Sequence, residues 1–183
     1  MAKNRRNDRQ GVTGSAIAVP ALAFVLGVVL VSPGPAAATI AGRDAAHCIA
    51  GEPAAQIRVA GFKQPSGTVQ VTLYSSDGWL KKGKYLRKVR VPVSQPGSID
   101  ICVAVPGPGR YGVAVHHDLN GNGNRDRADG GGFSRNPTVS LTNLRPRFVV
   151  ASFEVGASPR LIPVELLYLH GFRIGPERSS ATG

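Results

Sequence analysis

The stretch TVQVTLY, Thr68 to Tyr74, indicates most clearly which fold this chain takes. Apolar and polar residues alternate along it: Val69, Val71 and Leu73 lie between Thr68, Gln70 and Thr72. Because successive side chains of a strand point to opposite faces, a period of two places the apolar set on one face. We therefore predict a strand with one buried and one solvated face, as is common in antiparallel sheets.

Similar segments lie along the chain, and short groups rich in Gly, Pro, Asn and Ser separate them. We predict strands over residues 56–62, 68–74, 86–93, 98–105, 110–116, 138–144, 147–155 and 161–169. No segment has a convincing helical pattern, and we expect the single tryptophan, Trp79, to fill the core. The pattern predicts an all-β fold, a seven- to eight-stranded antiparallel β-sandwich of immunoglobulin or prealbumin type.

The first 38 residues have the three parts of a signal peptide. A basic start is followed by the apolar run Ala16–Val31 and by the small residues Pro35–Ala38. The apolar run is shorter than the roughly 20 residues that span a bilayer, so cleavage is favoured over an uncleaved leader that would anchor the chain. We predict a signal peptide at 1–38, an irregular N-terminal arm at 39–54, the sandwich at 55–171 and a disordered tail at 172–183. The protein is expected to be exported to the periplasm or beyond.

The chain has two cysteines, Cys48 and Cys102, and both lie in the part expected to be exported. Neither belongs to a CxxC pair or to a nucleophile turn, which disfavours a metal or catalytic thiol. In an oxidising compartment two such cysteines are typical of a disulfide. The bond would contribute roughly 3–4 kcal/mol to stability.

The formal net charge is +11, and part of it is concentrated in one basic run between residues 81 and 90. A surface of this sign favours anionic partners. We predict an anionic envelope polymer or protein as the partner, with a nucleic-acid or lipid A binder as an alternative and solubility alone as a simpler explanation. Nucleic acid is the less favoured partner, because only Trp79 and Tyr85 supply aromatic rings near the run. The residues of the predicted patch are Lys81, Lys82, Lys84, Arg87, Lys88 and Arg90.

A polar, glycine-rich stretch, HHDLNGNGNRDRADGGGFSRNP, runs from His116 to Pro137. Its oxygen-bearing side chains follow the spacing D-x-[DN]-x-[DN]-G of calcium loops, with Gly123 at the position of the sharp turn. An aspartate, Asp129, stands where such loops have glutamate, and Arg125 and Arg127 reduce the negative charge. We predict a calcium site with a Kd of about 10⁻⁴ to 10⁻³ M, and a plain Asn-Gly turn is the alternative. The predicted ligands are Asp118, Asn120, Asn122, Asn124 (by its carbonyl), Asp126 and Asp129.

Two histidines precede this loop, His116 and His117. Since neighbours on a strand point to opposite faces, the pair is a poor zinc or copper site. A hydrolytic, carbohydrate-active enzyme could use His117 with Asp118 or Asp126 as acid and base. No serine nucleophile turn or cysteine partner accompanies them, so this enzyme is a less favoured alternative and no catalytic residue is assigned.

The block RYGVAVHHDLNGNGNRD, together with the segment GGGFSRNP, resembles a bacterial family known as domain of unknown function 2141. The most specific matching residues are Tyr111, His117, Asp118, Asn120, Gly121, Asn122, Gly123, Asp126, Gly132, Phe133, Ser134 and Asn136. The resemblance extends over residues 56–171 and implies exported bacterial proteins with a β-sandwich and no established activity. Taken with the residues, it favours a non-enzymatic binding or structural module of the envelope whose loop binds calcium.

Overall fold

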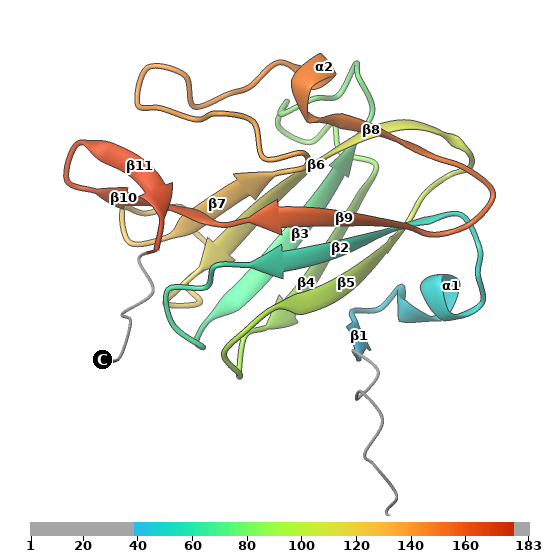
Figure 1. Ribbon diagram of the computed structural model, residues 1–183, viewed down its shortest axis with the longest axis horizontal. Coiled ribbons are helices and arrows are strands. Elements are labelled where there is room, and N and C mark those ends of the chain that lie inside the picture. The colour runs from blue at the N-terminus through green and yellow to red at the C-terminus, as the bar shows by residue number, and fades with distance from the viewer. Residues whose placement is uncertain (1–38, 178–183) are drawn as a thin grey trace, which may run out of the picture. The chain divides into compact units, whose positions relative to one another are not determined.

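The computed structural model describes residues 39–177 and has the predicted all-β fold. The signal peptide predicted at 1–38 lies outside the described residues. Two sheets face each other, and in Figure 1 strands β2, β5 and β9 pass in front of β3 and β4. The elements are β1 (Ile40–Ala41), α1 (Ala45–Ile49), β2 (Ala54–Ala60), β3 (Thr68–Tyr74), β4 (Arg87–Pro92), β5 (Ile99–Ala104), β6 (Gly109–Asp118), β7 (Gly130–Phe133), α2 (Phe148–Ala151), β8 (Ser152–Val155), β9 (Arg160–Glu165), β10 (Leu167–His170) and β11 (Arg173–Pro176).

The smaller sheet has the order β1-β5-β2-β9, and the larger one has the order β11-β10-β7-β6-β3-β4, with β8 also paired to β6. Strand β3 lies inside the larger sheet, between β4 and β6. Its Val69, Val71 and Leu73 are fully buried in the core between the sheets, as their alternation predicts. Val71 lies opposite Val89 and Val115, so the neighbouring strands contribute the same kind of side chain to the same face.

One predicted strand, 161–169, is divided into two by the structure. Strand β9 pairs in parallel with β2 in the smaller sheet, whereas β10 pairs with β11 and β7 in the larger sheet. Leu166 is the residue between them and is fully buried. The chain changes sheets here, which the apolar pattern does not reveal, because buried apolar side chains such as Val164 and Tyr168 lie on both sides of the change. Two pairs in the smaller sheet depart from the predicted antiparallel pairing, because β9 is parallel to β2 and β1 is parallel to β5.

Five other segments also differ from the predictions, and one of them is 130–133, which forms β7 where no strand is predicted. The arm at 39–54 contains β1 and α1, and residues 148–151 form α2 before β8, so the expectation of no helix is wrong. Residues 138–144 form no strand and have a single bridge between Ser140 and Asn143. Residues 173–176, predicted to be disordered, form β11 against β10. Within 39–177 no helix is long and apolar enough to span a membrane.

The N-terminal arm is held to the sandwich by covalent and ionic contacts. The predicted disulfide joins Cys48 of α1 to Cys102 of β5. Beside it, the buried carboxylate of Asp44 accepts two hydrogen bonds from the Arg87 guanidinium and one from the backbone N–H of Ala104. Burial alone would raise the pKa of Asp44, but these donors outweigh it and lower the pKa. Arg87 therefore has a structural role, because its guanidinium is already paired with Asp44.

Candidate functional site

The loop between β6 and β7, residues 118–129, begins at Asp118, whose side chain is buried at the end of β6. Asp118 Oδ2 accepts a hydrogen bond of 2.8 Å from the backbone N–H of Gly123. This contact fixes the sharp turn at Gly123, where φ is +80° and a side chain would be strained. Asp118 Oδ1 is buried and has no hydrogen-bond partner among the described residues. A buried carboxylate oxygen in this state usually has a ligand or a water as its partner.

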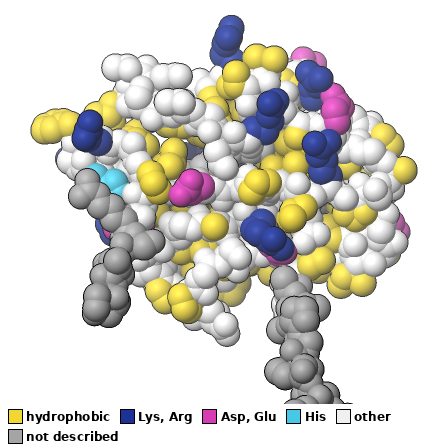
Figure 2. Space-filling view, in the orientation of Figure 1, with side chains coloured by type: hydrophobic (Ala, Val, Ile, Leu, Met, Phe, Trp, Pro, Cys, Tyr) yellow, Lys and Arg dark blue, Asp and Glu magenta, His cyan; other side chains and the backbone are white. Residues whose placement is uncertain are grey.

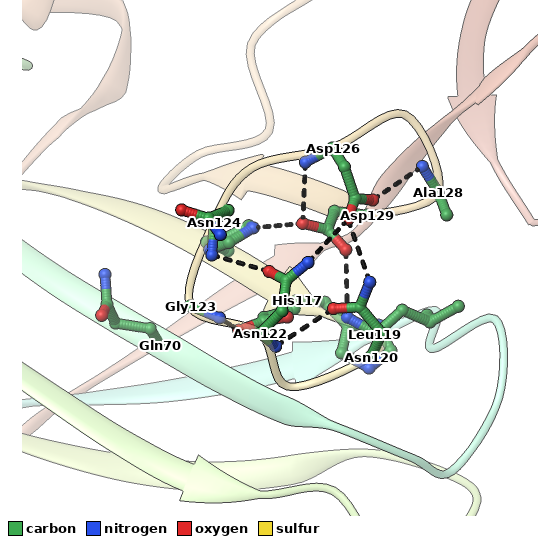
Figure 3. Close-up of polar contacts among 12 residues, drawn as sticks. Gln70, His117, Leu119, Asn120, Asn122, Gly123, Asn124, Asp126, Ala128 and Asp129 are labelled. Atoms are coloured by element: carbon green, nitrogen blue, oxygen red, sulfur yellow. Dashed lines mark hydrogen bonds and ion pairs between the residues drawn. The ribbon is translucent and has the colours of Figure 1, made fainter.

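The asparagines stiffen the loop by bonding its backbone. Asn120 Oδ1 accepts from Asn122 N at 3.1 Å, and Asn122 Oδ1 accepts from Asn124 N at 2.7 Å. Both side-chain amides donate to Asp126 Oδ2, at 3.0 and 3.3 Å. Figure 3 shows Asn120, Asp126 and Asp129 turned toward the inside of the loop.

Asp129 closes the loop at its far end. Its carboxylate accepts hydrogen bonds from the backbone N–H groups of Leu119 and Asp126, both at 3.1 Å, and lies 2.9 Å from His116 Nε2. Burial alone would raise the pKa of Asp129, yet these donors, with the Leu119 amide first, lower it. Asp129 is thus an ionised carboxylate that brings the two ends of the loop together.

All six predicted calcium ligands therefore lie in this loop, but most of their side chains bond other groups of the loop. Within residues 39–177 no three His, Cys, Asp or Glu side chains are grouped as metal ligands. The loop oxygens mostly accept hydrogen bonds from the loop's own N–H groups, whereas Asp118 Oδ1 is buried without a partner among the described residues. Calcium binding stays a prediction.

The two histidines point to opposite sides of β6. His116 faces outward to Asp129, whereas His117 is fully buried between the sheets. His117 Nε2 lies 2.9 Å from the carbonyl of Ser66, which can only accept, so Nε2 donates. The other ring nitrogen, Nδ1, lies 2.7 Å from the hydroxyl of Tyr168. Burial lowers the pKa of His117, so the ring is neutral and Nδ1 accepts from Tyr168.

A second feature is a groove of about 1000 Å³ on the outer face of the larger sheet. Its lining contains six cationic and four aromatic side chains and no aspartate or glutamate. We call it the cationic groove. Among the described residues, none of its six cations forms an ion pair with a carboxylate. The cations are Lys81, Lys82, Lys88, Arg125, Arg145 and Arg147, and the aromatic residues are Tyr74, Trp79, Tyr85 and Phe133.

The cationic groove and the basic patch predicted from the sequence overlap only in part. Lys81, Lys82 and Lys88 line the groove, whereas Lys84 does not. Arg87 bonds Asp44, and Arg90 donates to the side chain of Gln70. The other three cations of the groove come from the 118–129 loop and from residues 145–147, and no local pattern in the sequence connects those segments to the basic run.

Trp79 was expected in the core but is half-buried at the side of the cationic groove. Its ring packs edge-on against Tyr74 and Phe148, and its indole N–H donates to the Pro146 carbonyl at 2.7 Å. The Lys88 ammonium lies 4.5 Å from the ring centre of Tyr85. On the side of the molecule seen in Figure 2, Lys and Arg side chains stand apart from one another, and some lie beside acidic ones.

Comparison with known proteins gives one match. A family model described as an uncharacterised protein conserved in bacteria, domain of unknown function 2141, matches residues 57–162, more than half of the chain. No curated protein and no solved structure matches. The match runs from within β2 to within β9 and includes the 118–129 loop, and the sequence resemblance is confirmed.

Proposed function

The chain belongs to the bacterial family of domain of unknown function 2141, and we propose that it is an exported, non-enzymatic binding module whose cationic groove holds an anionic envelope partner. The observation that supports this role is the composition of the groove, six cations without a carboxylate. Unpaired cations set close together repel one another, and an anionic ligand would relieve that repulsion. The disulfide is in keeping with export, because such bonds are typical of compartments outside the reducing cytosol.

The hydrolase alternative is ranked lower because of where His117 lies. A general base must reach a substrate proton, yet this ring is fully buried and both its nitrogens are already hydrogen-bonded. Asp118 is buried as well, and its Oδ2 is engaged with the Gly123 amide. No observation on the described residues favours acid–base catalysis at this end of β6.

Binding of a soluble anionic polymer such as polygalacturonate tests the proposed role. We expect saturable binding that weakens by about tenfold between 0.05 and 0.5 M NaCl, since exposed charges are screened by salt. The double variant Lys82→Ser/Arg145→Ser should bind several-fold more weakly than the matched control Lys84→Ser/Arg173→Ser, which removes the same charge elsewhere. Equal affinity for the two variants would contradict a partner in the groove.

We also propose that the 118–129 loop takes up calcium, with Asp118 Oδ1 as a ligand that needs no broken hydrogen bond. Asn120, Asn122 and Asp126 would exchange their hydrogen bonds to one another for contacts between their side-chain oxygens and the ion. Asp129 already closes the loop. Arg125 lies in the same loop and lines the cationic groove. A bound ion would therefore hold Arg125 in position in the cationic groove. In this way calcium binding would support the binding of the anionic partner.

Calorimetry and thermal unfolding in calcium test this second part. With a Kd of about 1 mM, 10 mM calcium should stabilise the protein by roughly 1.4 kcal/mol. Asp118→Asn keeps the shape of the side chain and its acceptor for Gly123 but removes the charge, so the calcium effect should be lost. Asp77→Asn, at an exposed aspartate, is the control and should keep it. If the wild-type protein shows no heat and no rise in Tm at 10 mM calcium, the loop is a turn that needs no ion.

A further inference from the structure

Beside the cationic groove, on the same outer face, lies a second hollow of about 440 Å³. We call it the apolar cavity. It is lined mainly by aliphatic and aromatic side chains, among them Phe133, Leu141, Leu144, Leu167, Leu169 and Ile174. Arg125, Phe133 and Leu144 line both hollows, so the two are adjacent. Cavities of about 300–1,000 Å³ are the usual size for small-molecule ligands.

Gly131 of β7 lies beneath the apolar cavity. It is opposite His116 and Leu167 in the sheet, so a side chain at 131 would point to the outer face. A Cβ built there meets only the Val115 carbonyl oxygen, at 3.5 Å, and φ is not in the left-handed region. Neither packing nor backbone conformation therefore requires glycine at this position. The absence of a side chain at residue 131 leaves the space of the cavity open.

The side chains over the cavity are apolar and yet face water. Leu141 and Leu144, on the segment between β7 and α2, are 45% and 54% exposed. The lining also contains four charged residues, Arg125, Asp126, Arg127 and Asp129; both carboxylates accept hydrogen bonds from the loop, and Asp129 lies 2.9 Å from His116 Nε2. Arg125 lines both hollows and, like Arg127, forms no ion pair among the described residues, so a cation stands where the two hollows meet.

We propose that the two hollows form one site for an anionic amphiphile, a molecule with a single hydrocarbon chain and a carboxylate or phosphate head. The chain would lie over Gly131 against Leu141 and Leu144, and the head would meet the cations of the groove. A polar anion alone would leave the leucines in water, and an uncharged chain would leave the cations without a partner. The inference rests on the proposed binding role and names the class of its partner; it does not depend on calcium.

Fluorescence titration tests the site, because Trp79 is the only tryptophan of the chain and lines the groove. The probes are dodecyl phosphate and dodecanoate below their micelle concentrations, inorganic phosphate as the head alone, and dodecyl maltoside as an uncharged chain. At least one of the two anionic amphiphiles should bind about tenfold or more tightly than both single-feature probes, since each buried methylene adds to binding. The comparison of dodecyl phosphate with dodecanoate identifies the preferred head.

Two variants separate the site from nonspecific detergent binding. Gly131→Leu fills the apolar cavity and should weaken amphiphile binding about tenfold, while polygalacturonate affinity is unchanged. If this variant does not fold, Leu144→Ser, at an exposed position, should lower amphiphile affinity several-fold. Unchanged amphiphile affinity in the folded variant overturns the inference. If the wild-type protein binds polygalacturonate but neither amphiphile, the inference fails and the proposed function stands; if it binds none of them, both fail.

Discussion

The two faces of strand β7 use the same residue type for opposite purposes. Gly130 and Gly132 face the core, where a Cβ would lie 2.5 Å from the Tyr168 ring and 2.6 Å from the carbonyl oxygen of Glu165. Gly131, between them, faces outward and has open space above it. The inward glycines let the two sheets approach closely, and the outward one leaves a hollow. Within this run of three glycines, the outer two are required for packing, and the middle one leaves a cavity.

Polar groups follow the same division. On the inner side, the His117 ring is satisfied at both nitrogens, and the Tyr168 hydroxyl also accepts from the backbone N–H of Lys63. Burial raises the pKa of Tyr168 to about 12, so its hydroxyl stays protonated and can donate to His117. On the outer side, the cations of the groove have no carboxylate partner among the described residues. The inner face is complete by itself, whereas the outer face has unpaired charge and exposed apolar surface, as binding surfaces do.

The largest effect on this comparison is expected from alanine at Gly132. The new methyl group would meet the Glu165 backbone and Val164, and a backbone carbonyl cannot move aside as a flexible side chain can. Overpacking of this kind costs about 1–3 kcal/mol in the free energy of unfolding. Gly131→Ala is the matched control and should stabilise by roughly 0.5–1 kcal/mol, because alanine restricts the unfolded chain more than glycine does. Urea unfolding measures both, and equal losses in the two variants would remove the difference between the faces.

The sequence predicts the inner face of the sandwich better than the outer one. The alternation in TVQVTLY identifies Val69, Val71 and Leu73 as core, because burial and the period of the strand give the same signal. The cysteine pair is also predicted correctly, since two cysteines allow a single intramolecular bond. The change of sheet at Leu166 is missed, because residues buried in either sheet are equally apolar.

The site is predicted only where one segment contains it. The 118–129 loop can be identified because its oxygen donors recur at every second position, and its turn at Gly123 forms as the spacing predicts. The six cations of the cationic groove come from three separate segments, which only the fold brings together. Arg87 shows the opposite error, since it belongs to the basic run in sequence but bonds Asp44 in space. Net charge indicates the sign of the partner without showing which cations are free to meet it.

A smaller loss of stability is expected when the pH is lowered, because of the buried His117 on the inner face. Its pKa is below the ordinary value of 6.5, first because of burial, while the Ser66 carbonyl and the nearby Asp129 and Asp118 oppose the shift and His116 adds to it. The unfolded chain therefore takes up a proton below pH 6.5 that the native ring resists. The stability from this group is complete above that pH and is lost as the pH falls toward the native pKa.

Urea unfolding at pH 7.5 and 5.0 measures that loss. The free energy of unfolding of the wild-type protein should decrease between the two values, and the decrease should be smaller in His117→Gln, which cannot take up the proton. Asp44 and Asp129 do not contribute in this window, because their pKa values are lowered from 3.8 and their stabilisation is lost only at more acidic pH. His170→Gln, at an exposed histidine, should leave the decrease unchanged. If His117→Gln loses as much stability as the wild type between pH 7.5 and 5.0, the buried ring is not the group that makes the inner face sensitive to acid.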